Sequence, residues 1–586
     1  MDQGLWRSLA GIVFAIILVA PAADAMQMPQ AIAASQGKPN QITLRDLPQA
    51  SASGSMRLPA AAITAPLHSV PTADYLRMKA EAASRGAPLT PGTGTAAGVP
   101  AAPSGAVRTP AISTGFHGVG IGCGQAYPPD MALAVGPTAV LQVVNSCVGV
   151  FSKNGTLAPG FPKSLRAFLG LGSKAFPFDP RALYDWVNNR YIVSAVRFNE
   201  AKGVSILFVA VSKSSDPTGG WYVYHFNMVG QTILGYNELA DFPTLGQDRR
   251  GIYVTFNDFT DYPNFPTFAG SVLMLLPKHK MYAGASFHYW VVKGGALAGL
   301  DSIQPANVMN KGDNPRAEFM LGSENFSAGE CAGGCDKINV IAVSNPIYVD
   351  GSVLPEVSIL QITTKNTFFM PPNAQQPDCS SGSCLIDTGD PRISGEVTYA
   401  SGSLYGALTT SGTGAGAGEA HYLWFQIKPF LNDNNGSCTG KFTDKCPQII
   451  GAEEVNEVCY GCTNGFTDAT ASEYYPTVQP DPEGNVTVVY NLSSASDDPS
   501  VAYSSNRVTQ LPGTMHDPGY ILQSGMAEYQ RLDPNGSNRW GDYTATAVDL
   551  SPAKQPSFWF AGESSKSSDR WRTAIGHNGY KNVKQP

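Results

Sequence analysis

The sequence has no apolar run after its first 25 residues that is long enough to span a membrane, and it has no cluster of basic residues. A spanning helix needs about 18 consecutive apolar residues, so we expect no membrane span once those first residues are removed. Acidic residues outnumber basic ones by 46 to 39, for a formal net charge of −7. Nucleic acid is therefore not an expected partner, because phosphate binding requires a basic surface.

Several signatures of catalysis are also missing. The sequence contains no His-Glu-x-x-His zinc motif, no Gly-x-Ser-x-Gly nucleophile motif and no phosphate-binding loop. Its eight histidines are scattered without the spacing of metal ligands. We expect no cofactor, although a structural Ca²⁺ is a hypothesis at 256–261 or 432–437, where Asp and Asn oxygens suit a hard cation.

Residues 1–25 have the pattern of a secretory signal peptide. Arg7 supplies a positive charge, an apolar stretch follows, and Ala-Asp-Ala before Met26 is a small-x-small cleavage site. A permanent anchor is the alternative, but the apolar stretch is shorter than a spanning helix. The sequence therefore predicts a secreted or periplasmic protein.

Export changes how the ten cysteines are interpreted. An even number of cysteines in near-neighbour pairs indicates disulfides in an exported chain, although sequence does not determine their connectivity. The pairs are Cys123 and Cys147, Cys331 and Cys335, Cys379 and Cys384, Cys438 and Cys446, and Cys459 and Cys462. A redox dithiol at 459–462 is the alternative for the last pair, but no thioredoxin-like pattern surrounds it. A zinc site would have to join two pairs that lie far apart in the chain.

The chain changes character near residue 113. Residues 26–112 are rich in Ala, Pro, Gly, Ser and Thr and poor in aromatics, which predicts a mostly disordered linker or pro-segment. One stretch within it, 72–86, can form a short helix with Thr72 as its N-cap. From 113 to 586, β-branched and aromatic runs alternate with turn residues, which predicts an all-β domain.

A weak internal repeat runs through this domain. Each unit opens with Pro-x-apolar or a close relative, and an apolar strand that ends on polar residues follows. The openings are 127–135, 178–185, 241–248, 303–310, 389–396, 474–481 and 540–549, the last without a proline. One blade cannot cover its own faces, whereas a closed ring can, so the repeat predicts a β-propeller of about seven four-stranded blades. A row of β-sandwiches is the alternative.

The stretch Ser-Lys-Ser-Ser-Asp-Pro-Thr-Gly-Gly-Trp fits a hairpin in the second blade. Residues 204–212 would be the third strand and 221–226 the fourth. Ser and Asp side chains can accept hydrogen bonds from backbone N–H groups within the turn, and Gly219 and Gly220 permit positive φ. Trp221 is expected to pack over the turn into the core between blades.

This hairpin resembles the Asp-box of sialidase-like propellers, Ser-x-Asp-x-Gly-x-Thr-Trp. Ser214, Asp216 and Trp221 match, whereas Thr218 and Gly220 depart from the pattern. Asp-boxes in that family are structural turns, so the resemblance implies no catalytic role for Asp216.

The wider chain, about residues 120–580, is similar to a group of secreted bacterial propeller proteins. The shared elements stand here as Asp-Pro-Arg-Ala-Leu-Tyr-Asp at 179–185, Ser-Asp-Pro-Thr-Gly-Gly-Trp at 215–221 and Arg-Trp-Gly-Asp-Tyr at 539–543. The resemblance implies the fold and no particular activity.

A propeller brings the openings of its first strands and the ends of its second strands to one face. Charged and amide side chains recur there, which suits a polar ligand such as a glycan. The alternative is structural, because such side chains also satisfy backbone groups or bridge blades. The candidate ligand-binding residues are Asp130, Arg181, Asn257, Asp258, Glu324, Arg392, Asn491, Asp542 and Glu563, and Asn145 and Asp241 hold similar positions.

The sequence therefore predicts a monomeric, exported propeller that binds a carbohydrate or another extracellular ligand, such as a protein, at the polar face. A sialidase-like glycoside hydrolase is the first alternative, since Arg181, Arg316, Arg392 and Arg539 could form an arginine cluster. The Arg-Ile-Pro element of that family is missing, and no catalytic residue can be assigned. A structural or adhesive surface protein is the second alternative.

Overall fold

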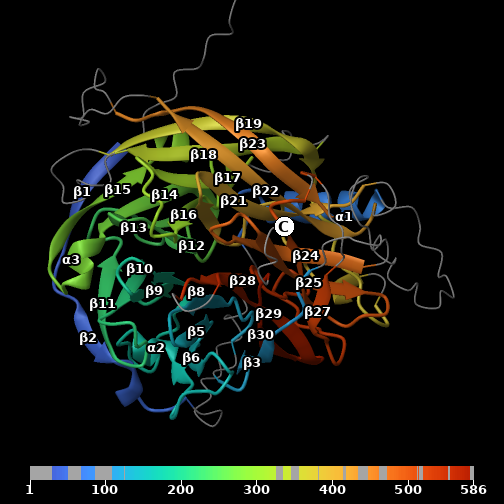
Figure 1. The fold of residues 1–586 in the computed structure, drawn as a ribbon, viewed down its shortest axis with the longest axis horizontal. Helices are drawn as coiled ribbons and strands as arrows, with labels where there is room; N and C mark the ends of the chain where they lie inside the picture. The colour runs from blue at the N-terminus through green and yellow to red at the C-terminus, as the bar shows by residue number, and fades with distance from the viewer. Residues whose placement is uncertain are drawn as a thin grey trace, which may run out of the picture.

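The computed structural model describes residues 30–50, 67–85, 109–123, 126–324, 334–344, 355–379, 382–413, 417–432, 446–460, 471–510, 512–513, 519–551 and 555–580. The predicted signal peptide and most of the hypothetical Ca²⁺ stretch 432–437 lie outside these residues. Within them the chain consists mainly of β-strands, so the all-β prediction is confirmed (Figure 1). No helix in this part of the chain combines the length and the apolar character needed to cross a bilayer.

Consecutive strands form four-stranded antiparallel groups in which neighbours in sequence are neighbours in the sheet. The described residues contain six such groups and a seventh whose fourth strand, β3 (Thr114–Gly120), comes from the start of the domain. They are numbered here 1 to 7 in chain order. Their first strands are β4 (Ala132–Val135), β8 (Phe178–Asp185), β12 (Leu239–Gln247), β16 (Gln304–Val308), β20 (Val397–Ala400), β24 (Ala471–Pro480) and β28 (Ala545–Asp549). Their second strands are β5 (Ala139–Val144), β9 (Arg190–Asn199), β13 (Gly251–Thr260), β17 (Glu318–Ser323), β21 (Ser403–Ser411), β25 (Val486–Ser494) and β29 (Ser557–Ser567).

The outer strands complete the groups. The third strands are β6 (Cys147–Ser152), β10 (Val204–Ser212), β14 (Thr267–Pro277), β18 (Cys335–Ser344), β22 (Ala420–Leu431), β26 (Ser500–Asn506) and β30 (Arg570–Asn578). The fourth strands are β7 (Lys163–Ser164), β11 (Gly220–Asn227), β15 (Phe287–Lys293), β19 (Glu356–Phe368), β23 (Ile449–Cys459), β27 (Tyr520–Gln523) and, for group 7, β3 (Thr114–Gly120). Short helices α2 (Leu165–Phe168) and α3 (Lys278–Tyr282) and the 3-10 turns η4 (Gly295–Leu297) and η6 (Gly382–Cys384) lie in the connections.

The groups follow one another around a ring. Each first strand contacts the first strands of the two adjacent groups, and β28 of group 7 contacts β4 of group 1. A separate hydrophobic cluster fills every interface between adjacent groups, including the interface between groups 7 and 1. Both faces of a group are thus covered by its neighbours. This explains why strands such as β10, Val-Ser-Ile-Leu-Phe-Val-Ala-Val-Ser, are nearly continuous apolar runs.

No sheet among the described residues closes on itself. Parallel pairing of β16 with β12 and with β20 joins groups 3, 4 and 5 into one large sheet, while the other groups form separate sheets. The ends of the domain meet where β3 pairs with β30, antiparallel, through residues 114–120 and 572–577. This pairing places a strand from the start of the domain at the outer edge of the last group.

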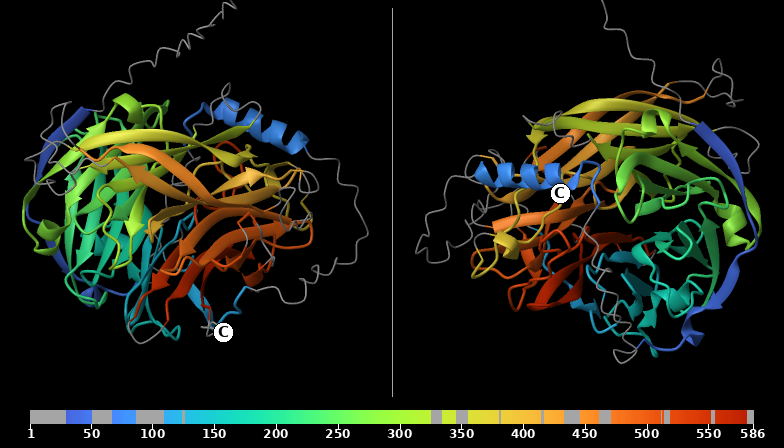
Figure 2. Two further views of the ribbon diagram at one scale, coloured as in Figure 1. Left: turned by 45° about the horizontal axis from the view of Figure 1, so that its top comes forward. Right: turned by 180° about the vertical axis from the view of Figure 1, so that it is seen from behind.

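The N-terminal segment packs on the ring in the parts that are described. β1 (Gln30–Gln36) pairs with β15 and β2 (Asn40–Thr43) pairs with β11, so each adds a fifth strand to an outer edge (Figure 2). η1 (Leu44–Asp46) follows β2, and helix α1 (Thr72–Ser84) lies close to the predicted 72–86, with Pro71 as its N-cap. For residues 30–50 and 67–85, this order differs from the prediction of a mostly disordered segment. The outer strands β15 and β11 offer backbone N–H and C=O groups with which the segment can pair. The composition of the segment does not show this.

The Pro-x-apolar repeat has a backbone explanation. Each predicted opening lies in or directly before the first strand of one group. In groups 2, 3 and 6 the residue before the proline has positive φ, at Asp179 (49°), Phe242 (50°) and Tyr475 (53°). The register with the second strand shifts at each of these places. Proline has no N–H for the ladder, so it marks a bulge that turns the start of the strand.

The predicted hairpin joins β10 and β11 as expected. Asp216 Oδ1 accepts hydrogen bonds from the Thr218 backbone N–H (2.9 Å) and hydroxyl (2.7 Å). Trp221 is fully buried between groups 1 and 2, and its Nε1 donates to the Pro217 carbonyl at 2.9 Å. The predicted positive φ at the two glycines is wrong, since neither has it. Close approach restricts them instead, because a Cβ on Gly220 would lie 3.0 Å from the Lys213 side chain.

Two of the predicted disulfides are present, Cys123–Cys147 and Cys379–Cys384. Cys335, Cys446 and Cys459 are each disulfide-bonded as well. Their predicted partners, Cys331, Cys438 and Cys462, lie outside the described residues. No cysteine within the described residues is free.

We expect Asp216→Ala to lower the free energy of unfolding by about 1–2 kcal/mol, because the turn loses two hydrogen bonds. Urea denaturation measures this loss. Arg45→Ala is the control, since it removes the exposed Arg45–Asp216 ion pair (2.8 Å) and the bond from Arg45 Nε to the Thr218 carbonyl (3.3 Å) but leaves the Asp216–Thr218 bonds intact. It should cost less than about 1 kcal/mol. An equal loss in both variants would assign the effect to the ion pair and not to the turn.

Candidate functional site

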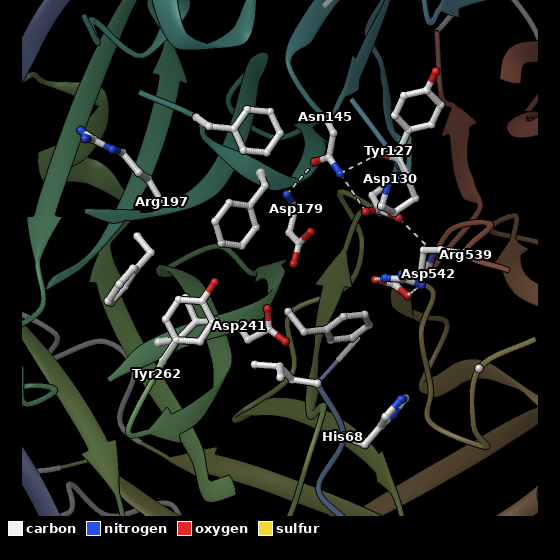
Figure 3. A pocket seen from close by; sticks show the side chains of 18 of the residues that line it. His68, Tyr127, Asp130, Asn145, Asp179, Arg197, Asp241, Tyr262, Arg539 and Asp542 are labelled. Carbon is white, nitrogen blue, oxygen red and sulfur yellow. Dashed lines mark hydrogen bonds and ion pairs between the residues drawn. The ribbon is translucent and has the colours of Figure 1, made fainter. Parts of the chain in front are cut away.

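A cavity of about 560 Å³ lies at the end of the ring where the first strands begin (Figure 3). Residues of groups 1, 2, 3, 5, 6 and 7 line it, together with Leu67 and His68 of the N-terminal segment. Carboxylates from four different groups face it: Asp130, Asp179, Asp241 and Asp542. The bulges at the strand openings place them there, since Asp130 and Asp179 both have positive φ and Asp241 directly precedes Phe242.

Asp130 is fixed by two hydrogen bonds from different groups. Its Oδ2 accepts from Asn145 Nδ2 (2.8 Å) and its Oδ1 accepts from the backbone N–H of Asp542 (2.9 Å). Asn145 also accepts, through Oδ1, from the backbone N–H of Asp179 at 2.8 Å. One amide side chain therefore holds two of the four carboxylate-bearing residues in a fixed arrangement.

The same kind of bond recurs between other groups. Asn257 Oδ1 accepts from the backbone N–H of Ser302 (2.8 Å), and Thr409 Oγ1 accepts from the backbone N–H of Tyr475 (3.0 Å). Ser302 and Tyr475, like Asp179, have positive φ. A side chain on the second strand of one group, or directly after it in the case of Asn145, thus satisfies the N–H at the opening of the next.

Burial and mutual repulsion change the ionisation of these carboxyls. Burial, followed by the negative charge of Asp542, raises the pKa of Asp130 to about 7. The same causes raise the pKa of Asp241 to about 6. Burial, with the charges of Asp130 and Asp241, raises the pKa of Asp179 well above its usual range. The cavity therefore holds carboxyl groups that take up protons near neutral pH.

Two arginines offset part of this negative charge. Arg539 binds Asp542 with both terminal nitrogens, at 2.6 Å each, and it is buried. Arg392 contacts Asp390 through Nε (2.7 Å) and through a terminal nitrogen (2.5 Å). Despite its burial, this pairing with Arg392 holds the pKa of Asp390 well below its usual range. Charge-assisted pairs of this kind fix the positions of both partners.

Aromatic rings also line the cavity. Phe176 and Phe178 lie parallel, with ring centroids 6.4 Å apart, and Tyr262 packs edge-on against Phe198 at 4.7 Å. The cavity therefore presents hydrogen-bond acceptors, cations and flat apolar surfaces to one ligand space. Such a site suits a ligand that has both hydroxyl groups and an apolar face.

Three of the nine candidate ligand-binding residues line the cavity: Asp130, Arg392 and Asp542. Asn145 and Asp241 line it too. Arg181 lies beneath it, fully buried, with Nε donating to the Pro243 carbonyl (3.0 Å) and a terminal nitrogen donating to the Ser394 carbonyl (3.0 Å). Its guanidinium stacks on the Tyr543 ring at 3.5 Å. Arg181 therefore ties several groups together under the floor of the cavity.

Three further candidates are buried between groups. Asn257 bonds the Ser302 backbone, as described above, and Asn491 donates to the carbonyls of Ser500 (3.1 Å) and Glu563 (2.7 Å). Glu563 is buried close behind Gly541, and burial and the charge of Asp130 raise its pKa well above the usual range. These three side chains lie outside the cavity lining, and those of Asn257 and Asn491 bond to the adjacent group.

The remaining candidates lie elsewhere. Asp258 is on β13 outside the cavity, where burial and the charge of Glu238 raise its pKa to about 7. Glu324 lies in a small recess beside Arg392, which also contains Asp301 and Val70. Of the predicted arginine cluster, Arg392 and Arg539 reach the cavity, whereas Arg316 bonds the Asn432 carbonyl on the surface.

Sequence reasoning missed Asp179, Asp390 and His68, all of which line the cavity. A signal for the first two was present, since Asp-Pro-Arg occurs at both 179–181 and 390–392. His68 had none, because it lies in the segment predicted to be mostly disordered. No cluster of three or more His, Cys, Asp or Glu side chains suited to a metal occurs in the described part of the chain.

No family model and no curated protein matches the chain. Among solved structures, it is similar to a GH43 endo-arabinanase from Bacillus licheniformis at 12% identity, covering 52% of this chain and 95% of that chain, with a TM-score of 0.27. An exo-β-1,3-galactanase from Phanerochaete chrysosporium matches at 10% identity, 66% and 80% coverage and a TM-score of 0.25. A Trypanosoma rangeli sialidase matches at 9% identity, covering 73% of this chain and 57% of that chain, with a TM-score of 0.30. Similarity this low does not establish a shared function.

The raised pKa of Asp130 predicts a pH-dependent stability. Between about pH 4 and pH 7 this group is protonated in the folded state and ionised in the unfolded state, so stability falls as pH rises through this window. We expect Asp130→Asn to reduce the fall in unfolding free energy between pH 5 and pH 8 by about 1–3 kcal/mol. Urea denaturation at several pH values measures it. A variant as steeply pH-dependent as the wild type would contradict this assignment.

Proposed function

We propose that the chain is a seven-bladed β-propeller, with groups 1 to 7 as its blades, and that it binds a glycan in the cavity. The ring of first strands and the hydrophobic cluster at every interface support the fold. Both features are expected where each blade depends on two neighbours to cover its faces.

The observation that carries the glycan proposal is the combination of charged and aromatic side chains in the cavity lining. Asp241 and Asp542 can accept hydrogen bonds from sugar hydroxyls, and Arg392 can donate to them. The C–H face of a sugar ring can pack on Phe178 or Tyr262. The volume of about 560 Å³ has the size of known small-ligand sites, which span about 300–1,000 Å³.

We further propose that the protein works outside the cytoplasm. The disulfides Cys123–Cys147 and Cys379–Cys384 support this location, because disulfides persist mainly in oxidising compartments. The signal-peptide pattern of residues 1–25 agrees with it.

A glycan array followed by calorimetry tests the binding proposal. Asp241→Asn removes a cavity-facing carboxylate, and we expect it to weaken binding of the selected glycan about tenfold or more, which is about 1.4 kcal/mol. Asp258→Asn is the matched control, because it removes a carboxylate from the same group outside the cavity, and it should change the Kd less than about twofold. Equal effects in both variants, or an array without any bound glycan, would contradict the proposal and favour an adhesive role.

Glycoside hydrolysis is a second candidate function. It is favoured by the contrast between Asp130, whose pKa is raised to about 7, and Asp542, which is ion-paired with Arg539. A carboxyl with a raised pKa beside a carboxylate held in an ion pair is the combination that glycoside hydrolysis requires.

A panel of chromogenic glycosides tests this second candidate. If the protein cleaves one of them, Asp130→Asn should lower kcat about a hundredfold or more, because the variant lacks the acidic proton. Unchanged cleavage in Asp130→Asn would exclude Asp130 as the acid, and a panel without cleavage would leave binding as the function.

A further inference from the structure

One sector of the cavity wall does not come from the ring. Among the described residues, groups 1, 2, 3, 5, 6 and 7 contribute lining residues and group 4 contributes none. In its place lie Leu67 and His68, and the next residues, Ser69 and Val70, cover the opening of group 4 at Asp301. The right panel of Figure 2 shows α1, which follows these residues, lying across this face.

His68 is held firmly in this position. Its ring stacks on Tyr75 with centroids 3.6 Å apart and an interplanar angle of 12°. Its Nδ1 lies 3.1 Å from Asp390 Oδ2 and 3.2 Å from a terminal nitrogen of Arg392. If Nδ1–H donates to Asp390, the Nε2 of the neutral ring becomes an acceptor for a ligand hydroxyl.

Helix α1 anchors this segment through a buried polar contact. The Tyr75 hydroxyl donates to Asp387 Oδ1 (3.0 Å), and Lys79 Nζ donates to Thr388 Oγ1 (2.8 Å) and the Pro371 carbonyl (3.0 Å). Lys79 and Asp387 also pair at 3.5 Å, with side-chain exposures of 6% and 2%. A buried charge needs its partner, so this contact fixes one docking position for α1 on group 5.

The apolar face of α1 fits the same position. Tyr75, Met78, Lys79 and Ala82 are buried, which is the spacing of one helix face. Tyr75, Met78 and Ala82 belong to the hydrophobic cluster between groups 4 and 5. The helix is therefore part of an interface between groups and not an attachment to the outer surface.

The segment borders the cavity and does not fill it. The volume of about 560 Å³ is present with Leu67 and His68 in place. A cover that blocked the site would occupy this space, whereas a wall leaves it open. The position of His68 beside Arg392 also places it among side chains that face the ligand space.

We propose that residues 67–85 form a permanent part of the ligand site, in which His68 contacts the ligand directly and α1 positions it. This inference rests on the proposed glycan-binding function. It assigns a binding residue to a segment outside the ring. Residues 67–85 would then be required for ligand binding, whereas a pro-segment could be removed without loss of binding.

Point variants test the role of His68. We expect His68→Ala to weaken glycan binding about fivefold or more, with a melting temperature close to that of the wild type. Arg77→Ala is the matched control, since Arg77 lies on the exposed face of α1, paired with Asp74 and Glu81. Arg77→Ala should leave the Kd unchanged. If Asp241→Asn weakens binding and His68→Ala does not, the inference fails while the proposed function stands; if no glycan binds the intact protein, both fail.

Cleavage tests the permanence of the segment independently of any single side chain. Sites for a specific protease inserted within 51–66 and 86–108 would cut residues 67–85 away from the rest of the chain. We expect the fragment to co-elute with the ring in gel filtration and the glycan Kd to stay within about twofold. Adding Lys79→Met should release the fragment and weaken binding. A released fragment with unchanged or tighter glycan binding would overturn the inference and make the segment a dispensable cover.

Discussion

The hydrogen bond between the second strand of one group and the opening residue of the next is the interaction on which the site depends. Asn145, Asn257 and Thr409 accept from the backbone N–H groups of Asp179, Ser302 and Tyr475. Those N–H groups belong to residues with positive φ at openings of first strands, where an unbonded buried N–H would destabilise the fold. The bond therefore stabilises an unfavourable backbone conformation. That conformation in turn fixes the direction of the side chain at the strand opening.

Gathering carboxylates in this way has an electrostatic cost. Asp130, Asp179 and Asp241 approach one another because the ring brings strand openings together, and burial raises the pKa of each. Arg392 and Arg539 compensate only part of the charge, each through a neighbouring Asp. Clusters of ionisable groups with shifted pKa values in a cavity are typical of functional sites, because repulsion between like charges does not stabilise the fold. The aromatic side chains of the lining then supply the apolar contact that the carboxylates and arginines lack.

The sequence predicted the strands better than the site. The repeated openings located the first strand of every group, and in groups 2, 3 and 6 the proline marks the bulge directly. Among the candidate site residues, Asp130, Arg392 and Asp542 line the cavity, whereas Arg181 and Glu563 are buried outside its lining. The difference arises because a bulge of two residues decides which side chain faces the cavity and which faces the core, and no pattern shows that. No sequence pattern predicted His68 as a site residue, because its position depends on the contact of α1 with a distant part of the chain.

A crystal structure with the glycan selected on the array tests the central claim most directly. The account predicts density for a sugar between the carboxylates of Asp241 and Asp542 and the rings of Phe178 and Tyr262, with a hydroxyl within hydrogen-bonding distance of His68 Nε2. Density for the glycan at another surface, such as the exposed Tyr236 and Phe265, with the cavity unchanged, would contradict it.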